Sequence, residues 1–130
     1  GECGIAIVNT YYLARLAASE DPQDQAVASA VGVVFPDQGG NGTHVNISGA
    51  GLVKTAPNAE KAIRFLEYLA GDEAQLLFAN GNYEYPAVPG LAATSSLVAL
   101  GDFDEDALNV SELGVNQAAA VMVFDRAGWK

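Results

Sequence analysis

The chain has 130 residues, half of them apolar, and sixteen acidic against six basic residues give it a formal net charge of −10 at neutral pH. This length fits one domain with a real core. The acidic balance argues against nucleic acid, whose binding proteins carry basic patches, and against an anionic membrane surface. We therefore expect no nucleic-acid partner.

The cysteine content and the chain ends further limit the kinds of protein and site that this sequence can form. Cys3 is the single cysteine, so an internal disulfide cannot form and one thiol cannot build a zinc site. We expect Cys3 to be a small residue near the first strand. No apolar run approaches the roughly 20 residues of a membrane span, and no signal peptide is evident. The chain has no initiator methionine and opens just before an apparent interior strand, which we interpret as a sign of a missing amino-terminal part.

The chain begins with a predicted strand that runs directly into a predicted helix. The apolar, largely β-branched run 5–8 is typical of a strand buried on both faces. Asn9 or Thr10 is a natural N-cap, and apolar residues then recur at helical spacing. Tyr11 and Tyr12 therefore fall in the first helical turn, at the carboxyl end of a strand. Ligands bind at this place in open α/β sheets, and the unpaired first-turn N–H groups attract anions.

Two phenols at this junction have a specific chemical use. A phenol has a pKa of about 10 and is a poor ligand while protonated. A helix N-terminus and a trivalent cation both favour the phenolate, whose hard anionic oxygen suits Fe(III). Neighbouring helical residues lie roughly 100° apart, so the rings of Tyr11 and Tyr12 converge only if both swing toward the helix start. The alternative is structural, with one tyrosine packed in the core and the other on the surface.

Further elements follow in chain order. Asp21 is a predicted cap with Pro22 at the first helical position. The pattern then predicts strands over 31–35, 43–48 and 49–53. A glycine-rich turn at 37–42 lies between the first and the second of these strands. The strongest helical pattern covers 59–70, and Gly71 ends this helix. Asp72 begins the next helix, in which Gln75 completes a capping box and Asn80-Gly81 forms the end. Residues 82–89 should be extended, and the last helix should run from about 115 to 127. Strands alternating with helices predict an α/β architecture.

Several other segments invite a functional interpretation that we reject. The loop 37–42 has glycines that can cradle an anion, but no Gly-Lys-Ser/Thr follows, and a mobile turn is the better explanation. His44 is the single histidine and is not assigned as a ligand. The acidic patch at 101–106 lacks EF-hand spacing, so we expect a solvated helix start. Tyr83 and Tyr85 would share one side of a strand and pack against a helix.

Five motifs in order along the chain resemble one protein family. They are Gly-x-x-x-Ile-Ala-Ile-x-Asn-Thr-Tyr-Tyr at the start, Val-x-Phe-Pro, Gly-Thr-His-Val-Asn-Ile-Ser-Gly-Ala-Gly, Ala-Pro-Asn-x-x-x-Ala-x-x-Phe-Leu-x-Tyr-Leu, and Asn-Gly-Asn-Tyr-Glu-Tyr-Pro, followed by the closing Gly-Trp-Lys. The chain resembles the periplasmic ferric-ion-binding proteins of bacterial ABC transporters over nearly all its residues.

The resemblance implies a fold and a ligand set. The fold is the α/β type II periplasmic binding protein fold, two lobes closing on a ligand, of which this chain would be the carboxyl-terminal portion only. Residues 1–44 would belong to the carboxyl-terminal lobe, 45–95 would complete the amino-terminal lobe, and 96–130 would return. Two consecutive tyrosines bind Fe(III) in that family, here Tyr11 and Tyr12, and Asn9 falls on a contact to the synergistic anion that some members bind. The remaining ligands would lie outside this chain.

The implied function is capture of Fe(III) through tyrosine phenolates, outside the cytoplasm in the periplasm, for delivery to an ABC permease, without catalysis. The missing amino-terminal part of the chain, or a self-associated copy, would cover the apolar surface left exposed. Within the same fold, the alternative is a binding protein for a small organic solute or anion, in which the tyrosines stack on the ligand. An enzyme with Tyr12 as acid or base has no supporting motif.

Overall fold

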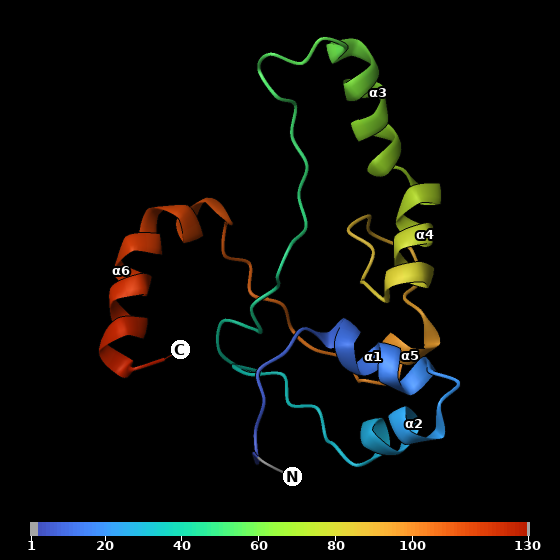
Figure 1. Ribbon diagram of the computed structural model, residues 1–130, viewed down its shortest axis with the longest axis vertical. Helices are drawn as coiled ribbons and strands as arrows, with labels where there is room; N and C mark the ends of the chain where they lie inside the picture. Colours follow the sequence, from blue (N-terminus) through green and yellow to red (C-terminus); the bar gives the residue numbers. More distant parts are fainter. Residues whose placement is uncertain (1–2, 130) are drawn as a thin grey trace. The chain divides into compact units, whose positions relative to one another are not determined.

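The computed structural model describes residues 3–129, which form six helices and no β-strand (Figure 1). In chain order the helices are α1 Thr10–Ala18, α2 Pro22–Ser29, α3 Ala59–Leu69, α4 Asp72–Asn82, α5 Ser95–Val98 and α6 Ser111–Ala127. Contacts within the chain define two compact units. Unit 1 is Gly1–Val34 with Asn46–Asp102 and holds α1 to α5, whereas unit 2 is Phe35–Val45 with Phe103–Lys130 and holds α6.

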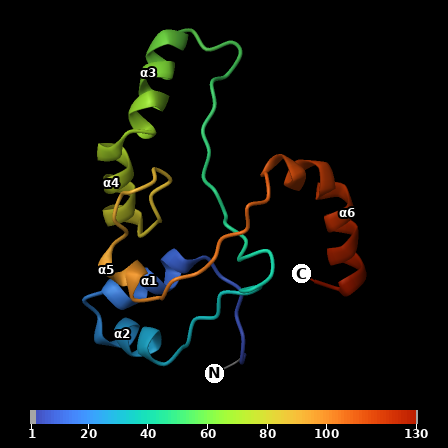
Figure 2. The same ribbon diagram turned by 180° about the vertical axis from the view of Figure 1, so that it is seen from behind.

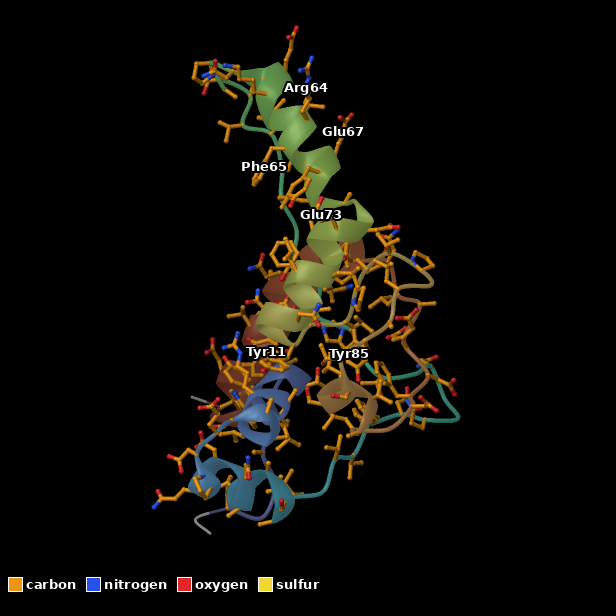
Figure 3. The ribbon with its side chains drawn as sticks, turned by 90° about the vertical axis from the view of Figure 1, so that its right-hand side faces the viewer. Tyr11, Arg64, Phe65, Glu67, Glu73 and Tyr85 are labelled. Atoms are coloured by element: carbon orange, nitrogen blue, oxygen red, sulfur yellow. The ribbon has the colours of Figure 1, made fainter. Side chains whose placement is uncertain are left out.

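Two of the predicted helices are confirmed together with their signals. Pro22 is the first residue of α2, and the Asp21 carboxylate accepts a hydrogen bond from the backbone N–H of Gln23 at 2.8 Å. This cap satisfies one of the donors that every helix start leaves unpaired. α3 is amphipathic as expected, because Arg64 and Glu67 point to one side of the helix while Phe65 points to the other (Figure 3).

The predicted capping box of α4 is wrong, and so is its predicted end. Gln75 does not return to the helix start; its Nε2 donates to the Leu69 carbonyl at 2.8 Å and its Oε1 accepts from the Ala87 N–H at 2.7 Å. These two bonds join the end of α3 to the segment after α4. The helix also continues through Gly81 and ends at Asn82, where the C-cap residue Tyr83, with its left-handed φ of 59°, breaks the helical path. Glycine in the last turn costs too little to stop a helix by itself.

The core of unit 1 gathers around α5, which the sequence pattern did not predict because α5 has only four residues. Leu97 of α5 is fully buried. α1 packs against both α2 and α5, as both ribbon views show (Figure 2). The other buried apolar side chains of the described residues are all small: Ala14, Ala74 and Ala79. The small alanine side chains allow the helices to approach closely, but they bury little apolar surface.

The predicted strands over 5–8, 31–35, 43–48 and 49–53 are absent from the described part of the chain, so those predictions are wrong for this structure. These segments are extended without ladder partners, and Ile5 and Ile7 are 87% and 85% exposed rather than buried. A strand requires a neighbouring strand to satisfy its backbone N–H and C=O groups. Cys3, expected near the first strand, is likewise exposed.

Unit 2 is organised by the turn at 37–42, which is closed by its own aspartate. The Asp37 carboxylate accepts the Asn41 N–H at 3.0 Å, and the Asp37 carbonyl accepts the N–H groups of Gly40 and Gly42 at 3.1 and 3.2 Å. Several N–H groups that an anion would need are thus already used within the turn, in keeping with the rejection of an anion cradle here. The turn leads to a parallel bridge between Thr43 and Glu105, where the Thr43 N–H donates to the Asp104 carbonyl at 2.7 Å.

The expectation of a solvated helix start at 101–106 is wrong, because the bridge to Thr43 holds this segment extended. The side chain of Gln38 reinforces it, accepting the Asp104 N–H at 2.7 Å and donating to the Asp104 carbonyl at 2.9 Å. α6 begins at Ser111, earlier than predicted, where the Asn109 side chain accepts the Ser111 N–H at 3.0 Å. Within the described residues, no helix combines the length and apolarity needed to cross a membrane.

Candidate metal site

The candidate site lies at the start of α1 in unit 1, where an extended segment turns into the helix. Asn9 occupies the N-cap position with an extended backbone, φ −72° and ψ 146°, as one of the two predicted alternatives has it. Its carboxamide makes no cap hydrogen bond; it points instead to the Tyr11 hydroxyl, with Nδ2 donating at 3.3 Å. The first turn contains no acidic residue, so the positive end of the helix keeps its field for a bound anion or a phenolate.

The two tyrosine rings converge, as the metal-binding hypothesis requires. Their centroids lie 4.4 Å apart with the ring planes tilted by 42°. Tyr11 is half-buried and Tyr12 is 52% exposed, and each hydroxyl shifts the pKa of the other. The structural alternative, with one ring in the core and the other alone on the surface, is not the arrangement seen here. Two phenol oxygens are thus presented together at a helix start.

The hydroxyl pair divides into one more acidic and one less acidic phenol. The hydrogen bond from Tyr12 lowers the pKa of Tyr11 below its ordinary value, with further lowering from the Asn9 amide and the Arg15 guanidinium. Desolvation and the Glu84 carboxylate act in the opposite direction on the Tyr11 pKa. The pKa of Tyr12 is raised, first by the same hydrogen bond and then by the charge of Tyr11. Tyr11 is therefore the first of the two to become a phenolate.

Arg15 and Glu84 complete the surroundings of Tyr11, and the sequence reasoning named neither as a site residue. The Arg15 guanidinium carbon lies 5.2 Å from the centroid of the Tyr11 ring, a cation–π distance. Arg15 lies four residues after Tyr11 on the same helix, a spacing that could have indicated the contact. Glu84 follows the end of α4, which approaches the start of α1, where Tyr11 is labelled in Figure 3. No local pattern joins Glu84 to Tyr11.

Asn46 is a third site residue that sequence reasoning missed. Its Nδ2 donates to Asn9 Oδ1 at 3.3 Å, across 37 positions of the sequence. Asn46 opens the extended segment that leads toward α3, so this bond brings a distant part of unit 1 to the start of α1. Its place within the Gly-Thr-His-Val-Asn motif was the one available signal.

The other tyrosines and the histidine considered in the sequence lie in different surroundings from the Tyr11–Tyr12 pair. Tyr83 ends α4 in a left-handed conformation. The Tyr85 hydroxyl donates to the Leu97 carbonyl at 3.4 Å, and burial raises its pKa. His44 is exposed. The part of the chain that the structure describes has no cluster of three or more His, Cys, Asp or Glu side chains able to hold a metal ion.

Sequence comparison relates the whole chain to iron-uptake proteins. No protein-family model matches it. It is 47% identical over 130 residues to iron uptake protein A1 of Synechocystis sp., covering 100% of this chain and 36% of the relative. Iron uptake protein A2 of the same organism is 49% identical over 128 residues, covering 97% and 37%. A more distant relative, the major ferric iron-binding protein of Neisseria meningitidis, is 25% identical over 130 residues.

Comparison with solved structures likewise finds iron-binding proteins. A Trichodesmium protein (IdiA, FutA) in complex with iron and citrate superimposes with a TM-score of 0.89 and 56% identity, covering 95% of this chain and 39% of that one. Apo FutA2 from Synechocystis matches with a TM-score of 0.88 and 50% identity over 96% and 40%. The ferric binding protein from Campylobacter jejuni matches with a TM-score of 0.87 and 34% identity, again over 96% and 40%.

These matches confirm the predicted fold class. The chain spans 36 to 40% of the length of these relatives, so it forms part of the two-lobe fold. The lobe boundaries 1–44, 45–95 and 96–130 stay a prediction. In both sequence and fold, the chain matches the periplasmic ferric-ion-binding proteins, over roughly two fifths of such a protein.

Proposed function

We propose that this chain is part of an extracytoplasmic solute-binding protein that captures Fe(III) through the phenolates of Tyr11 and Tyr12 and delivers it to an ABC permease. The observation that carries the proposal is the paired hydroxyls at the start of α1, with the pKa of Tyr11 lowered. Iron is the cargo, and the chain's role is binding without catalysis. A periplasmic location is in keeping with a Serratia marcescens relative named as a periplasmic Fe(3+)-binding protein, 28% identical over 82 residues.

The chemistry of the pair suits a hard trivalent ion. Binding of Fe(III) would displace one proton from each of the two hydroxyls to solvent, and the ion's charge would then stabilise both phenolates. Tyr11 gives up its proton more readily, since the Tyr12 hydroxyl, then Asn9 and Arg15, already stabilise the negative oxygen. Two phenolates leave an octahedral ion short of ligands, so the rest of the whole protein and an anion would complete the coordination. The Trichodesmium protein was solved in complex with citrate as well as iron, which makes a carboxylate a reasonable anion to test.

Asn9 is the proposed anion contact. Its carboxamide lies beside Tyr11, and the first-turn N–H groups of α1 point in the direction where an anion gains from the helix field. An anion bridging this helix start and the iron would be stabilised by both. Removal of the Asn9 amide should therefore weaken the effect of the anion on iron binding.

Ferric titration of the complete natural polypeptide that carries this sequence, followed by visible absorption, tests the proposal. Ferric phenolate absorbs visible light, so the wild-type protein should become coloured on adding Fe(III). Tyr11→Phe and Tyr12→Phe should each lose most of the colour and bind iron more weakly. Tyr68→Phe, which removes an exposed hydroxyl on α3, is the matched control and should behave as the wild type.

Two results of the ferric titration would contradict the proposal. Unchanged colour and affinity in both site variants would show that the two phenols are not ligands. A colourless wild-type protein that binds another solute would move the assignment to the alternative, a binding protein of this fold for a small organic solute or anion. Repeating the titration with and without citrate, for wild type and Asn9→Ala, tests the anion contact.

A further inference from the structure

We propose that Asn46 is a positioning residue of the iron site, which fixes the orientation of the Asn9 carboxamide so that its N–H, rather than its oxygen, faces Tyr11. The inference rests on the proposed function, since it concerns how the Tyr11 oxygen is prepared for Fe(III). Two hydrogen bonds carry it: Asn46 Nδ2 donates to Asn9 Oδ1, and Asn9 Nδ2 donates to the Tyr11 oxygen, each at 3.3 Å.

A carboxamide has two chemically different ends. Its oxygen only accepts hydrogen bonds, and its nitrogen only donates them. When Asn46 holds the oxygen of Asn9, the nitrogen is left to face Tyr11. An N–H donor stabilises the negative oxygen of a metal-bound phenolate, whereas an amide oxygen at the same place would repel that oxygen. The orientation of Asn9 therefore decides whether this neighbour favours or opposes metal binding.

Asn9 alone does not fix that orientation. Its carboxamide makes no cap hydrogen bond with α1, so the helix backbone does not distinguish the two ends. Tyr11 does not distinguish them either, because a phenol hydroxyl both donates and accepts. Among the hydrogen bonds of the described residues, the one from Asn46 is the contact on the far end of the Asn9 carboxamide. The Asn46 side chain is also exposed, so its contribution to this site does not come from packing in the core.

Two substitutions at position 46 separate this role from packing. Asn46→Asp keeps the size but replaces the donor by an acceptor, which draws the Asn9 nitrogen away and turns its oxygen to Tyr11. Asn46→Leu keeps similar bulk and removes the hydrogen bond without imposing the wrong orientation. The negative charge of Asn46→Asp would by itself attract Fe(III), so a loss of affinity in this variant cannot arise from charge.

The measurement is the Fe(III) affinity of the complete natural polypeptide, together with its ferric-phenolate absorption band. A hydrogen bond to a charged oxygen is commonly worth a factor of about ten to a hundred in affinity. We expect Asn46→Asp to lose iron affinity by about that factor and to shift the band, and Asn46→Leu to lose less. Asn58→Asp is the matched control, because Asn58 makes no side-chain cap hydrogen bond at the start of α3.

A double-mutant cycle with Asn9→Ala completes the test. With the Asn9 carboxamide removed, Asn46→Asp should cause no further loss of affinity. An equal loss with and without Asn9, or no loss in Asn46→Asp, would overturn the positioning role while leaving the proposed function intact. A wild-type protein that does not bind Fe(III) at all would refute the proposed function itself, so the two failures are distinguishable.

Discussion

Gly42 offers the sharpest test of the structure, because the chain passes very close to Glu105 at this point. Gly42 is buried with a φ of +97°, and a Cβ added there would lie 2.6 Å from both the carbonyl carbon and the oxygen of Glu105. It would also lie 2.8 Å from the Asp106 nitrogen. These are backbone atoms, so they cannot move aside as a flexible side chain does. Gly42→Ala therefore has to displace the bridge formed by Thr43.

The magnitude follows from two contributions. The positive φ costs a residue with a side chain about 1–2 kcal/mol. Overpacking against fixed atoms typically costs a further 1–3 kcal/mol or so. The sum for Gly42→Ala is about 2–5 kcal/mol. Gly39 supplies the matched control, since its φ is +84° but nothing lies within 4 Å of the added Cβ. Gly39→Ala should therefore cost only the first contribution, about 1–2 kcal/mol.

Amide hydrogen exchange of Thr43 in the complete polypeptide measures the effect, because this N–H donates to the Asp104 carbonyl at 2.7 Å and exchanges only when the bridge opens. A cost of about 2 kcal/mol corresponds to exchange about 30-fold faster, since about 1.4 kcal/mol is a factor of ten. Gly42→Ala should reach or exceed this value, and Gly39→Ala should fall below it. Equal acceleration in the two variants would refute the close approach of Gly42 to Glu105.

Three further predictions concern the site and the core of unit 1. Tyr12→Phe removes the hydroxyl that lowers the pKa of Tyr11, so in the metal-free protein the Tyr11 phenolate should form at higher pH, which a near-ultraviolet absorbance titration detects; an unchanged or lowered pKa would contradict this effect of Tyr12 on Tyr11. Leu97→Ala empties the one large fully buried position among the described residues and should cost about 2–5 kcal/mol in denaturant unfolding, whereas a change within error would place Leu97 outside the core. Gln75→Leu leaves the Ala87 N–H without its partner, so exchange of that amide should accelerate about tenfold, and unaltered exchange would disprove the link from α4.

Most of the longer helices and the position of the tyrosine pair could be predicted from the sequence because their signals are local. Asp21 and Pro22 specify the start of α2 through bonds within a few residues. The same holds for the placement of Tyr11 and Tyr12 in the first turn of α1. A helix satisfies its backbone within its own segment, so its pattern can be read without knowing its neighbours.

The strand predictions are wrong because strands depend on contacts that are distant in the sequence. The run 5–8 has the composition of a buried strand, yet a strand forms only when another segment supplies its hydrogen-bond partners. The described residues supply no such partner, and Ile5 stays exposed. The acidic segment 101–106 was misjudged in the same way, since its extended form depends on pairing with Thr43 from a distant part of the chain.

By itself, the sequence determined the longer helical segments, the acidic charge, the tyrosine pair and the resemblance to ferric-ion-binding proteins. The tertiary structure alone decided what surrounds Tyr11: the amide of Asn9 turned away from its cap, Asn46 behind it, and Glu84 from the end of α4. The physical reason is distance along the chain. Composition and periodicity report on contacts within a few residues, whereas the pKa of Tyr11 depends partly on groups that only folding brings near it.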